Sequence, residues 1–325
     1  MIRTGLIGRG MAGTVFHAPL IRAAEGLELS ATAGSADAAD LIASPAIDLV
    51  VIATPNESHA PLARAALEAG KHVVIDKPFA LYSGEADELI DLARARGRML
   101  TVFHNRRWDG DFLTVKKVLG EGALGDLALY EAHWDRFRPA IKHGWREVPA
   151  HGAGVLWDLA PHLIDQAVEL FGVPDSIAAD IAVQRPAAAV DDYFHLTFHY
   201  GSMRAILGAS TLAAAPRPRF ALHGSAGSFV KHGLDPQEAA LKEGADPRDS
   251  GFGEDPVHGL LTLPEETRPV RTEKGRYLTF YETAAAACRG EAPPPVDPAE
   301  ARTVIALLEF ARASAQLGAR LVPSL

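Results

Sequence analysis

Short apolar segments alternate with helical patterns over the first third of the chain. The run at 48–53 (Asp-Leu-Val-Val-Ile-Ala) is β-branched and apolar on both faces, which is typical of a parallel strand covered on both sides. Similar runs occur at 2–7, 27–33, 71–75 and 99–103, with helical patterns ending near 24 and spanning 61–69 and 83–96. Gly70 and Gly97 follow the last two patterns as helix stops. This alternation predicts a doubly wound parallel sheet.

The pattern changes after about Asn105. A helix is predicted at 155–171, before Gly172, and the remaining strand candidates are 127–135, 177–184, 193–200, 203–211, 219–224 and 228–231. Successive strands with few helices between them predict an antiparallel sheet. Residues 235–269, rich in Gly, Pro and charge, predict a long loop. Asp-Pro-Ala-Glu at 297–300 predicts the start of a final helix, 297–317, which is a candidate to pack back on the N-terminal domain.

The chain is therefore predicted to be an α/β protein of two domains. Residues 1–105 form the parallel sheet, and 106–325 form an α/β domain with a large, mainly antiparallel open sheet. The length of 325 residues agrees with two domains at about 150 residues each.

Composition narrows the class of protein. Hydrophobic residues make up 48% and charged residues 22%, as in ordinary globular proteins. A net charge of −9 argues against a nucleic-acid partner, and the longest apolar runs are too short to span a membrane. Cys288 is the single cysteine, which excludes an intrachain disulfide. The first residues lack a signal-peptide pattern, so we expect a cytoplasmic protein.

A glycine motif follows the first strand. Gly8-x-Gly10-x-x-Gly13 stands between a strand and a helix, as a dinucleotide fingerprint requires. We expect residues of this loop to bind the cofactor pyrophosphate: Gly8, Arg9, Gly10, Met11, Ala12 and Gly13. The alternative is a glycine-rich turn without a ligand. Pro19 is expected to kink or break the helix that follows.

The end of the second strand favours NADP over NAD. NAD-binding folds usually place a carboxylate there to hold the ribose 2′-hydroxyl. This chain has Ala33-Gly34-Ser35, with Asp37 slightly later, and Ser35 is a predicted cofactor contact. No Arg follows to clamp a 2′-phosphate, so NAD stays possible. Asp37 has a second interpretation as a helix cap.

Two further motifs carry polar groups. Asp76-Lys77-Pro78 follows a parallel strand at the edge where such sheets bind ligands, and the Lys77–Pro78 bond is predicted to be cis. Asp158 and His162 share one face of a predicted helix, as does Asp165. A surface contact is the alternative for this pair. No metal is predicted, because two ligands make an incomplete site.

Together these motifs resemble the Gfo/Idh/MocA oxidoreductase family. The resemblance spans nearly the whole chain and rests on the glycine motif and the stretches 53–56 (Ala-Thr-Pro-Asn), 76–78, 152–154 (Gly-Ala-Gly) and 158–162. Residues 16–21 (Phe-His-Ala-Pro-Leu-Ile) and 105–109 (Asn-Arg-Arg-Trp-Asp) resemble the branch with NADP-dependent scyllo-inositol dehydrogenases. Members usually have Glu in place of Asp76.

The resemblance implies an N-terminal Rossmann domain and a C-terminal domain that binds substrate and forms a dimer or tetramer through its sheet. It also implies hydride transfer between NADP, or NAD, and a secondary alcohol or ketone of a sugar or cyclic polyol. His162 would be the general acid or base, because the ordinary histidine pKa, about 6.5, lies near neutral pH. Lys77 and Asp158 would hydrogen-bond the reacting hydroxyls, with all three side chains converging on one cleft. Further implied cofactor contacts are Thr54, Pro55, Asn56, His59, Asp76, Lys77, Pro78, Asn105 and Arg106, and implied substrate contacts are Lys77, Arg106, Trp145, Asp158 and His162.

Several of these residues have alternative interpretations. Arg106 is nearly as well explained by a domain-interface ion pair, and Trp145, like His143 and Arg146, by packing of its loop. Tyr277 is better explained as a core aromatic than as a pocket residue, and His195 and His199 as the polar face of a strand.

One departure from the family is large. Only residues 34–47 separate the second strand from the strand at 48–53, which is enough for one short crossover where members usually fit a helix, a strand and another helix. Either the sheet lacks a strand or a mobile segment is missing from the sequence.

Two other functions remain open. The first is NAD-dependent glycosidase chemistry on the same fold. The second is a non-catalytic NADP-binding regulator, against which the set of Lys77, Asp158 and His162 argues.

Overall fold

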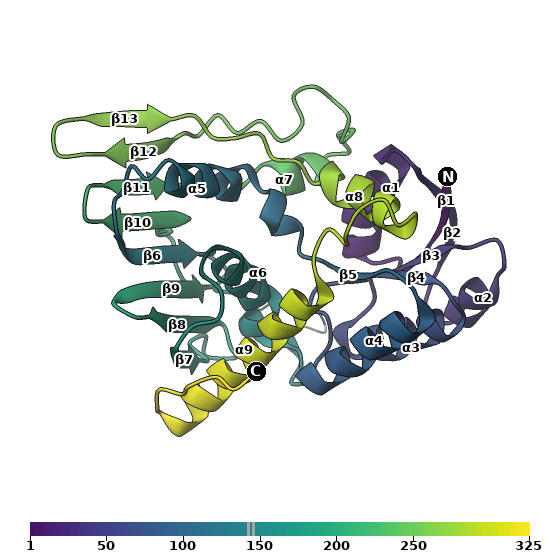
Figure 1. Cartoon of the computed structure of the whole chain (residues 1–325). Helices are drawn as coiled ribbons and strands as arrows, with labels where there is room; N and C mark the ends of the chain where they lie inside the picture. Colours follow the sequence, from purple (N-terminus) through teal and green to yellow (C-terminus); the bar gives the residue numbers. More distant parts are fainter. Residues whose placement is uncertain (142–143, 145–146) are drawn as a thin grey trace. The chain divides into compact units, whose positions relative to one another are not determined.

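The computed structural model (Figure 1) describes residues 1–141, 144 and 147–325. The predicted substrate residue Trp145 lies outside the described residues, as do His143 and Arg146. The chain forms two compact units, each treated by itself below. Unit 1 is Met1–Asp109, Pro236–Gly253 and Gly275–Ile305; unit 2 is Gly110–Asp235, Glu254–Lys274 and Ala306–Leu325.

Unit 1 contains a parallel sheet of five strands in the order β2-β1-β3-β4-β5. The strands are β1 (Ile2–Ile7), β2 (Leu27–Ala33), β3 (Leu49–Ile52), β4 (His72–Asp76) and β5 (Leu100–Phe103). All four residues of β3 and of β5 are buried, which explains the apolar sequence of β3 and, apart from Thr101, of β5. The predicted doubly wound parallel sheet is confirmed.

Helices cover both faces of this sheet. Figure 1 shows α2 (Ala38–Ala43), α3 (His59–Glu68) and α4 (Ser83–Arg96) on one side, and α1 (Ala18–Ala23) and α8 (Leu278–Cys288) on the other. Gly97 ends α4 in the left-handed conformation, with φ +62°. Shorter turns of unit 1 are η1 (Ala12–His17), η2 (Asn56–Ser58), η3 (Asn105–Trp108) and α7 (Gln237–Lys242).

The short connection between β2 and β3 carries only α2. β3 pairs with β1 on the side opposite to β2, so one helix completes the crossover and residues 34–48 contain no further strand. The adenosine side of the sheet is thus built with fewer elements than the family pattern predicts.

The first helix does not break at Pro19. The π-helix η1 passes directly into α1, and Pro19 lies in the first turn of α1. The missing N–H of Pro19 coincides with the change from π to α hydrogen bonding, so the chain stays helical. The expected kink is replaced by a change in helix type.

Unit 2 contains a sheet of eight strands in the order β13-β12-β11-β10-β6-β9-β8-β7. In the described chain only β6 and β9 are parallel, so the sheet is mainly antiparallel, as predicted. The strands are β6 (Leu127–His133), β7 (Ser176–Ala182), β8 (Tyr193–Tyr200), β9 (Met203–Ser210), β10 (Phe220–Gly224), β11 (Ser228–Lys231), β12 (Gly259–Thr262) and β13 (Thr267–Val270).

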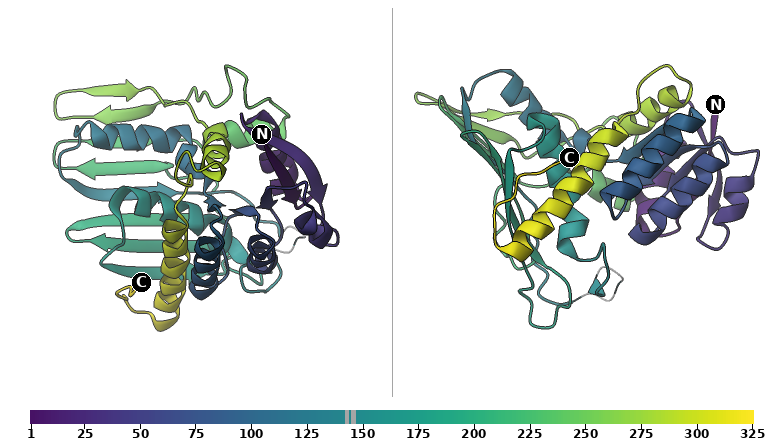
Figure 2. Two further views of the ribbon diagram at one scale, coloured as in Figure 1. Left: turned by 45° about the vertical axis from the view of Figure 1, so that its right-hand side comes forward. Right: turned by 60° about the horizontal axis from the view of Figure 1, so that its bottom comes forward.

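Helices α5 (Gly110–Gly120) and α6 (Gly154–Phe171) lie on one face of the unit 2 sheet (Figures 1 and 2). Along β8, Phe194, Leu196 and Phe198 are buried, whereas His195 and His199 occupy the alternate positions on the other face. On β8 that second face is the polar one, as the sequence predicts for these two histidines.

The predicted long loop at 235–269 is wrong. It contains α7, β12 and the start of β13, of which β12 and β13 extend the edge of the sheet. These strands have four residues each. Leu260 of β12 is exposed, and the edge strand β13 has exposed polar positions and Pro269, as is usual for edge strands. Because this stretch has the composition of a loop, the sequence did not predict these strands. Helices α5 and α8 were also not predicted.

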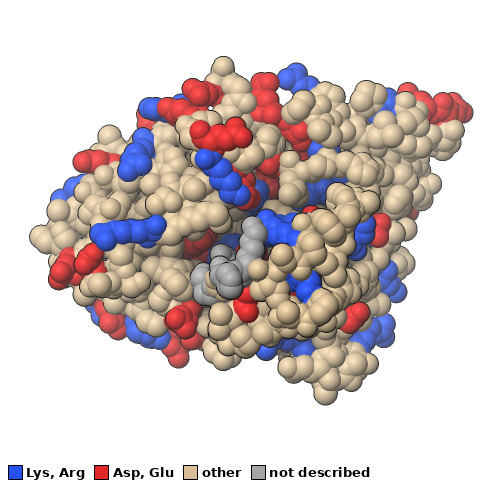
Figure 3. Space-filling view, turned by 180° about the vertical axis from the view of Figure 1, so that it is seen from behind, with Lys and Arg blue, Asp and Glu red and all other residues tan. Residues whose placement is uncertain are grey.

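The final helix α9 (Pro298–Leu317) begins one residue after the predicted start. Its residues up to Ile305 belong to unit 1, where Arg302 pairs with Asp87 of α4 at 2.9 Å. On the face drawn in Figure 3, acidic and basic side chains are interspersed.

Candidate functional site

The unit 1 sheet brings the predicted cofactor residues to one edge. The segments that follow β1, β2, β3, β4 and β5 all lie at the carboxyl ends of parallel strands, where doubly wound folds bind ligands. These segments contain Gly8–Gly13, Ser35, Thr54–Asn56, Asp76–Pro78 and Asn105–Arg106.

The three glycines of the first loop meet different surroundings. A Cβ on Gly8 would lie 2.2 Å from the Ala53 carbonyl oxygen, and one on Gly13 would lie 2.0 Å from the Gly8 carbonyl oxygen. These two glycines are required by close approach of the protein's own backbone. A Cβ on Gly10 would meet no heavy atom within 4 Å. The open space beside Gly10 fits a ligand such as a cofactor pyrophosphate.

His59 joins two of the loops at this edge. Its side chain is fully buried, with Nδ1 2.8 Å from the Pro78 carbonyl oxygen and Nε2 2.9 Å from the Thr54 carbonyl oxygen. Burial lowers the pKa of this imidazole. His59 is therefore an interior residue, and its contacts hold the loops after β3 and β4 together. A contact of His59 with the cofactor stays a prediction.

A buried row of polar side chains stands behind Lys77. The Asp76 carboxylate accepts a hydrogen bond from the Lys77 N–H at 2.9 Å, and its Oδ1 lies 3.6 Å from Nε2 of His17. Nδ1 of His17 is hydrogen-bonded to the Tyr281 hydroxyl. Although burial opposes it, the pKa of Asp76 is lowered by His17, Lys77 and His59. The row therefore holds an ionised carboxylate against the main chain of Lys77.

The Lys77–Pro78 peptide bond is cis, as predicted. The sequence did not point to the row itself. His17 is visible only as part of the stretch 16–21, and Tyr281 is 264 positions away from it.

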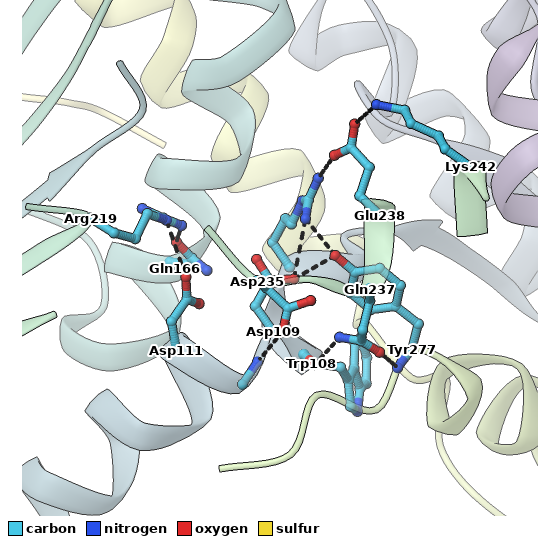
Figure 4. Close-up of polar contacts among 12 residues, drawn as sticks. Trp108, Asp109, Asp111, Gln166, Arg219, Asp235, Gln237, Glu238, Lys242 and Tyr277 are labelled. Atoms are coloured by element: carbon cyan, nitrogen blue, oxygen red, sulfur yellow. Dashed lines mark hydrogen bonds and ion pairs between the residues drawn. The ribbon is translucent and has the colours of Figure 1, made fainter. Parts of the chain in front are cut away.

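Arg106 is buried in an ion-pair cluster within unit 1 (Figure 4). Its guanidinium pairs with Asp109 at 3.4 Å and with Glu238, and it is hydrogen-bonded to the Tyr277 hydroxyl. The hydroxyl in turn donates to Asp109 at 2.6 Å, and Tyr277 is fully buried. The cations Arg106 and Lys242 lower the pKa of Glu238 to about 2, against the effect of its burial.

This cluster shows that Tyr277 is a core aromatic. It also gives the Arg106 charge two carboxylate partners inside the protein. A contact of Arg106 with cofactor or substrate stays a prediction.

In unit 2, the start of α6 is fixed by Asp191. Its carboxylate accepts a hydrogen bond from the Leu156 N–H at 2.6 Å. A Cβ on Gly154 would lie only 2.2 Å from Oδ1 of this carboxylate. Gly154 has φ +89°. Burial raises the pKa of Asp191 to about 6. The glycine that begins the helix thus makes room for the Asp191 carboxylate at the helix start.

Asp158 and His162 lie one turn apart on α6. Asp158 pairs with Arg136 at 3.4 Å, and the His162 ring stacks on Trp134 with centroids 5.7 Å apart. The Arg219 guanidinium lies 5.2 Å from the Trp134 ring and donates a hydrogen bond to Gln166 of α6 at 2.8 Å (Figure 4). The surface-contact interpretation fails for His162, which is 6% exposed. Lys77 belongs to unit 1, so a shared centre with Asp158 and His162 stays a prediction.

Two features complete the description. Of the helices in the described ranges, none combines the length and the apolar character needed to cross a membrane. Within the same ranges, three or more His, Cys, Asp or Glu side chains do not come together in an arrangement that could hold a metal ion.

A parallel sheet with an open glycine loop, joined to a unit with a large open sheet, defines a two-unit oxidoreductase with a nucleotide-binding domain. The chain belongs to the Gfo/Idh/MocA oxidoreductase family. Residues 31–104 match the NAD-binding Rossmann fold of that family, and residues 116–322 match its C-terminal alpha/beta domain.

Individual relatives cover almost the whole chain. Uncharacterized oxidoreductase YdgJ of Escherichia coli is 46% identical over 97% of this chain and 96% of its own. The scyllo-inositol 2-dehydrogenase (NADP(+)) IolW of Bacillus subtilis is 37% identical over 97% and 94%, respectively. A solved structure of an oxidoreductase from Yersinia pestis is 41% identical with a TM-score of 0.95, covering 100% of this chain and 97% of that one.

Proposed function

We propose that this protein is an NADP-dependent dehydrogenase or reductase. It transfers a hydride between the nicotinamide and a secondary alcohol or ketone of a sugar or cyclic polyol. The proposal rests above all on Asp158 and His162, which lie one turn apart on α6 in a chain that also carries an open dinucleotide loop.

The protein's task in this reaction is to move a proton and orient the substrate. Oxidation of the alcohol removes a hydride from carbon and a proton from oxygen, leaving a ketone, and the bound nicotinamide supplies the hydride chemistry. We assign the proton transfer to His162. The Asp158 carboxylate is assigned to accept a hydrogen bond from a substrate hydroxyl, and the Lys77 side chain to donate one to the reacting oxygen. In the reductive direction the same groups act in reverse.

The structure around each group supports these assignments. Stacking on Trp134 holds the His162 ring, and Arg136 lies beside the Asp158 carboxylate. The Asp76 carboxylate fixes the main chain at Lys77. The His162 ring, the Asp158 carboxylate and the main chain at Lys77 therefore have neighbours in their own units, which reduces the entropy lost on reaching a reactive geometry.

A named relative and one segment of the chain support the substrate class and the cofactor. IolW, a relative with 37% identity, is named for scyllo-inositol and NADP(+). The segment after β2 (Gly34-Ser35-Ala36) lacks a carboxylate for a ribose 2′-hydroxyl, which favours NADP.

We also propose that the face of the unit 2 sheet opposite α5 and α6 forms a dimer or tetramer. Half-buried His195 and Arg217 lie on this side of the sheet, and size-exclusion chromatography of the purified protein tests the proposal. Elution as a monomer would contradict it.

Removing the proposed proton-transfer group tests the function. We expect His162→Ala to lower turnover by about 10²–10⁴-fold on a substrate found by screening polyols and aldoses with NADP and NAD. The dissociation constant for the cofactor should stay unchanged, because no cofactor contact is assigned to this imidazole. His232→Ala, at an exposed histidine, is the matched control.

Three outcomes would contradict the proposal. Full turnover of the His162 variant removes the assigned role. Tight copurifying cofactor without net oxidation or reduction indicates glycosidase-type chemistry. Cofactor binding without any activity that depends on Lys77 indicates a regulator.

A further inference from the structure

We propose that Arg9 selects NADP by binding its 2′-phosphate, and that its ion-pair partner Asp37 acts against this choice by favouring the 2′-hydroxyl of NAD. The inference rests on the proposed function, because it concerns the same cofactor site. Arg9 would determine which cofactor is bound, and the sequence did not reveal this role because Arg9 precedes β2.

The fold brings Arg9 to the end of β2. The Gly8 N–H donates a hydrogen bond to the Ala33 carbonyl at 2.9 Å, so the chain at Arg9 starts beside the last residue of that strand. Nη1 of Arg9 then lies 3.7 Å from the place of a Cβ on Gly34. In doubly wound folds this is where the adenosine ribose is bound, and an Arg there accommodates a 2′-phosphate. Arg9 precedes β2 in sequence, so a search for an Arg after that strand cannot find it.

The partner of Arg9 is the first carboxylate after β2. Nη2 of Arg9 lies 3.2 Å from Oδ2 of Asp37, with side chains 62% and 58% exposed. Asp37 stands at the N-cap of α2, yet its side chain makes no capping hydrogen bond. The interpretation of Asp37 as a helix cap is therefore not supported by its contacts. Its carboxylate instead pairs with the guanidinium, which lies beside Gly34.

The chemistry of the pair favours a phosphate ligand. A guanidinium has five N–H donors in a fixed fork, and one contact to Asp37 leaves donors for phosphate oxygens. The exposed ion pair is weak, so a bound dianion outweighs it. The small residues Gly34 and Ser35 leave room for the group, and the Ser35 hydroxyl is a further donor. Asp37 alone would repel the phosphate and would accept a hydrogen bond from the 2′-hydroxyl of NAD.

The two side chains therefore act on cofactor choice in opposite directions. Arg9→Gln should weaken NADPH binding about 10- to 100-fold, the effect of losing a hydrogen bond to a charged group, and change NADH binding by less than about twofold. Asp37→Asn should leave NADPH binding equal or tighter and weaken NADH binding. Arg22→Gln removes an exposed arginine of α1 and should change neither.

Fluorescence titration of the purified full-length chain with NADPH and NADH measures these constants without a known substrate. Equal weakening of both nucleotides by Arg9→Gln would overturn the inference, because it would assign Arg9 to the adenine or pyrophosphate. No weakening of either, or tighter binding of NADH than NADPH by the unaltered protein, would overturn it too. Failure of the unaltered protein to bind either nucleotide would overturn the proposed function as well.

Discussion

Two buried histidines, His133 and His59, make the stability of the folded protein depend on pH. His133 on β6 is 4% exposed, and its pKa is lowered to about 4 by burial and by the nearby cations Arg217 and Arg219. His59 in unit 1 also has a lowered pKa because of burial. A histidine whose pKa is lower in the folded state binds fewer protons there than in the unfolded chain. Its contribution to stability is therefore present above its ordinary pKa and is lost as the pH falls toward the folded value.

A substitution at His133 tests this coupling. We expect the free energy of unfolding of the unaltered protein to decrease between pH 7.5 and 5.5, with about 1 kcal/mol of the decrease due to His133. His133→Asn should reduce the pH dependence by that amount. Urea unfolding followed by the fluorescence of Trp134, the buried neighbour in the chain, measures it. The same dependence in both proteins would show that His133 does not titrate as described.

Contacts between residues that are far apart in the chain could not be predicted from the sequence. The glycine motif, the Lys77 turn and the pair on α6 are local patterns, so the sequence predicts them. Arg9 with Asp37 and His17 with Tyr281 are 28 and 264 positions apart, and neither pairing has a local pattern. Their roles follow only from the packing of strands and helices.

At the scale of helices and strands, burial affects which elements can be predicted from the sequence. The strands of unit 1 were predicted within about two residues, because a parallel strand buried on both faces has a continuous apolar sequence. The strands β12 and β13 were missed because each has only four residues and both lie in a stretch rich in Gly, Pro and charge. Helix α8, with four consecutive alanines, lacks the polar face that marks an amphipathic helix.

Helix α6 gives a prediction for a single element. Asp191→Ala should lower the free energy of unfolding by about 1 kcal/mol, because the Leu156 N–H loses its acceptor at the helix start. Asp191→Asn keeps an oxygen acceptor and removes a buried charge, so its stability at pH 7.5 should equal or exceed that of the unaltered protein. Urea unfolding of both variants measures this. Equal losses in the two would show that the charge, and not the acceptor, stabilises α6.

At the scale of the whole molecule, unit 1 is discontinuous in sequence. Its first segment ends at Asp109, but several of its buried polar groups find partners in the two later segments. Thr101 donates a hydrogen bond to the Val296 carbonyl at 2.8 Å, and His17 contacts Tyr281. Arg106 is paired with Glu238. The sheet alone is therefore an incomplete folding unit.

A fragment tests this conclusion. Residues 1–109 expressed alone should lack a cooperative urea transition, because Thr101, His17 and Arg106 would lose buried partners, each at a cost of about 1–3 kcal/mol. Near-ultraviolet circular dichroism measures the transition, with the full chain as control. A sharp transition in the fragment would show that the first segment folds independently.

The discontinuity of unit 1 also has a consequence for synthesis. Ribosomes add about 5–20 residues per second, so roughly 10–40 s pass between the emergence of Asp109 and that of Ile305. During this interval the nascent first segment exposes the apolar surface that α8 later covers, including Phe103, whose ring lies 4.9 Å from that of Phe280. The newborn chain is thus a natural client for chaperones that bind apolar segments at the ribosome exit.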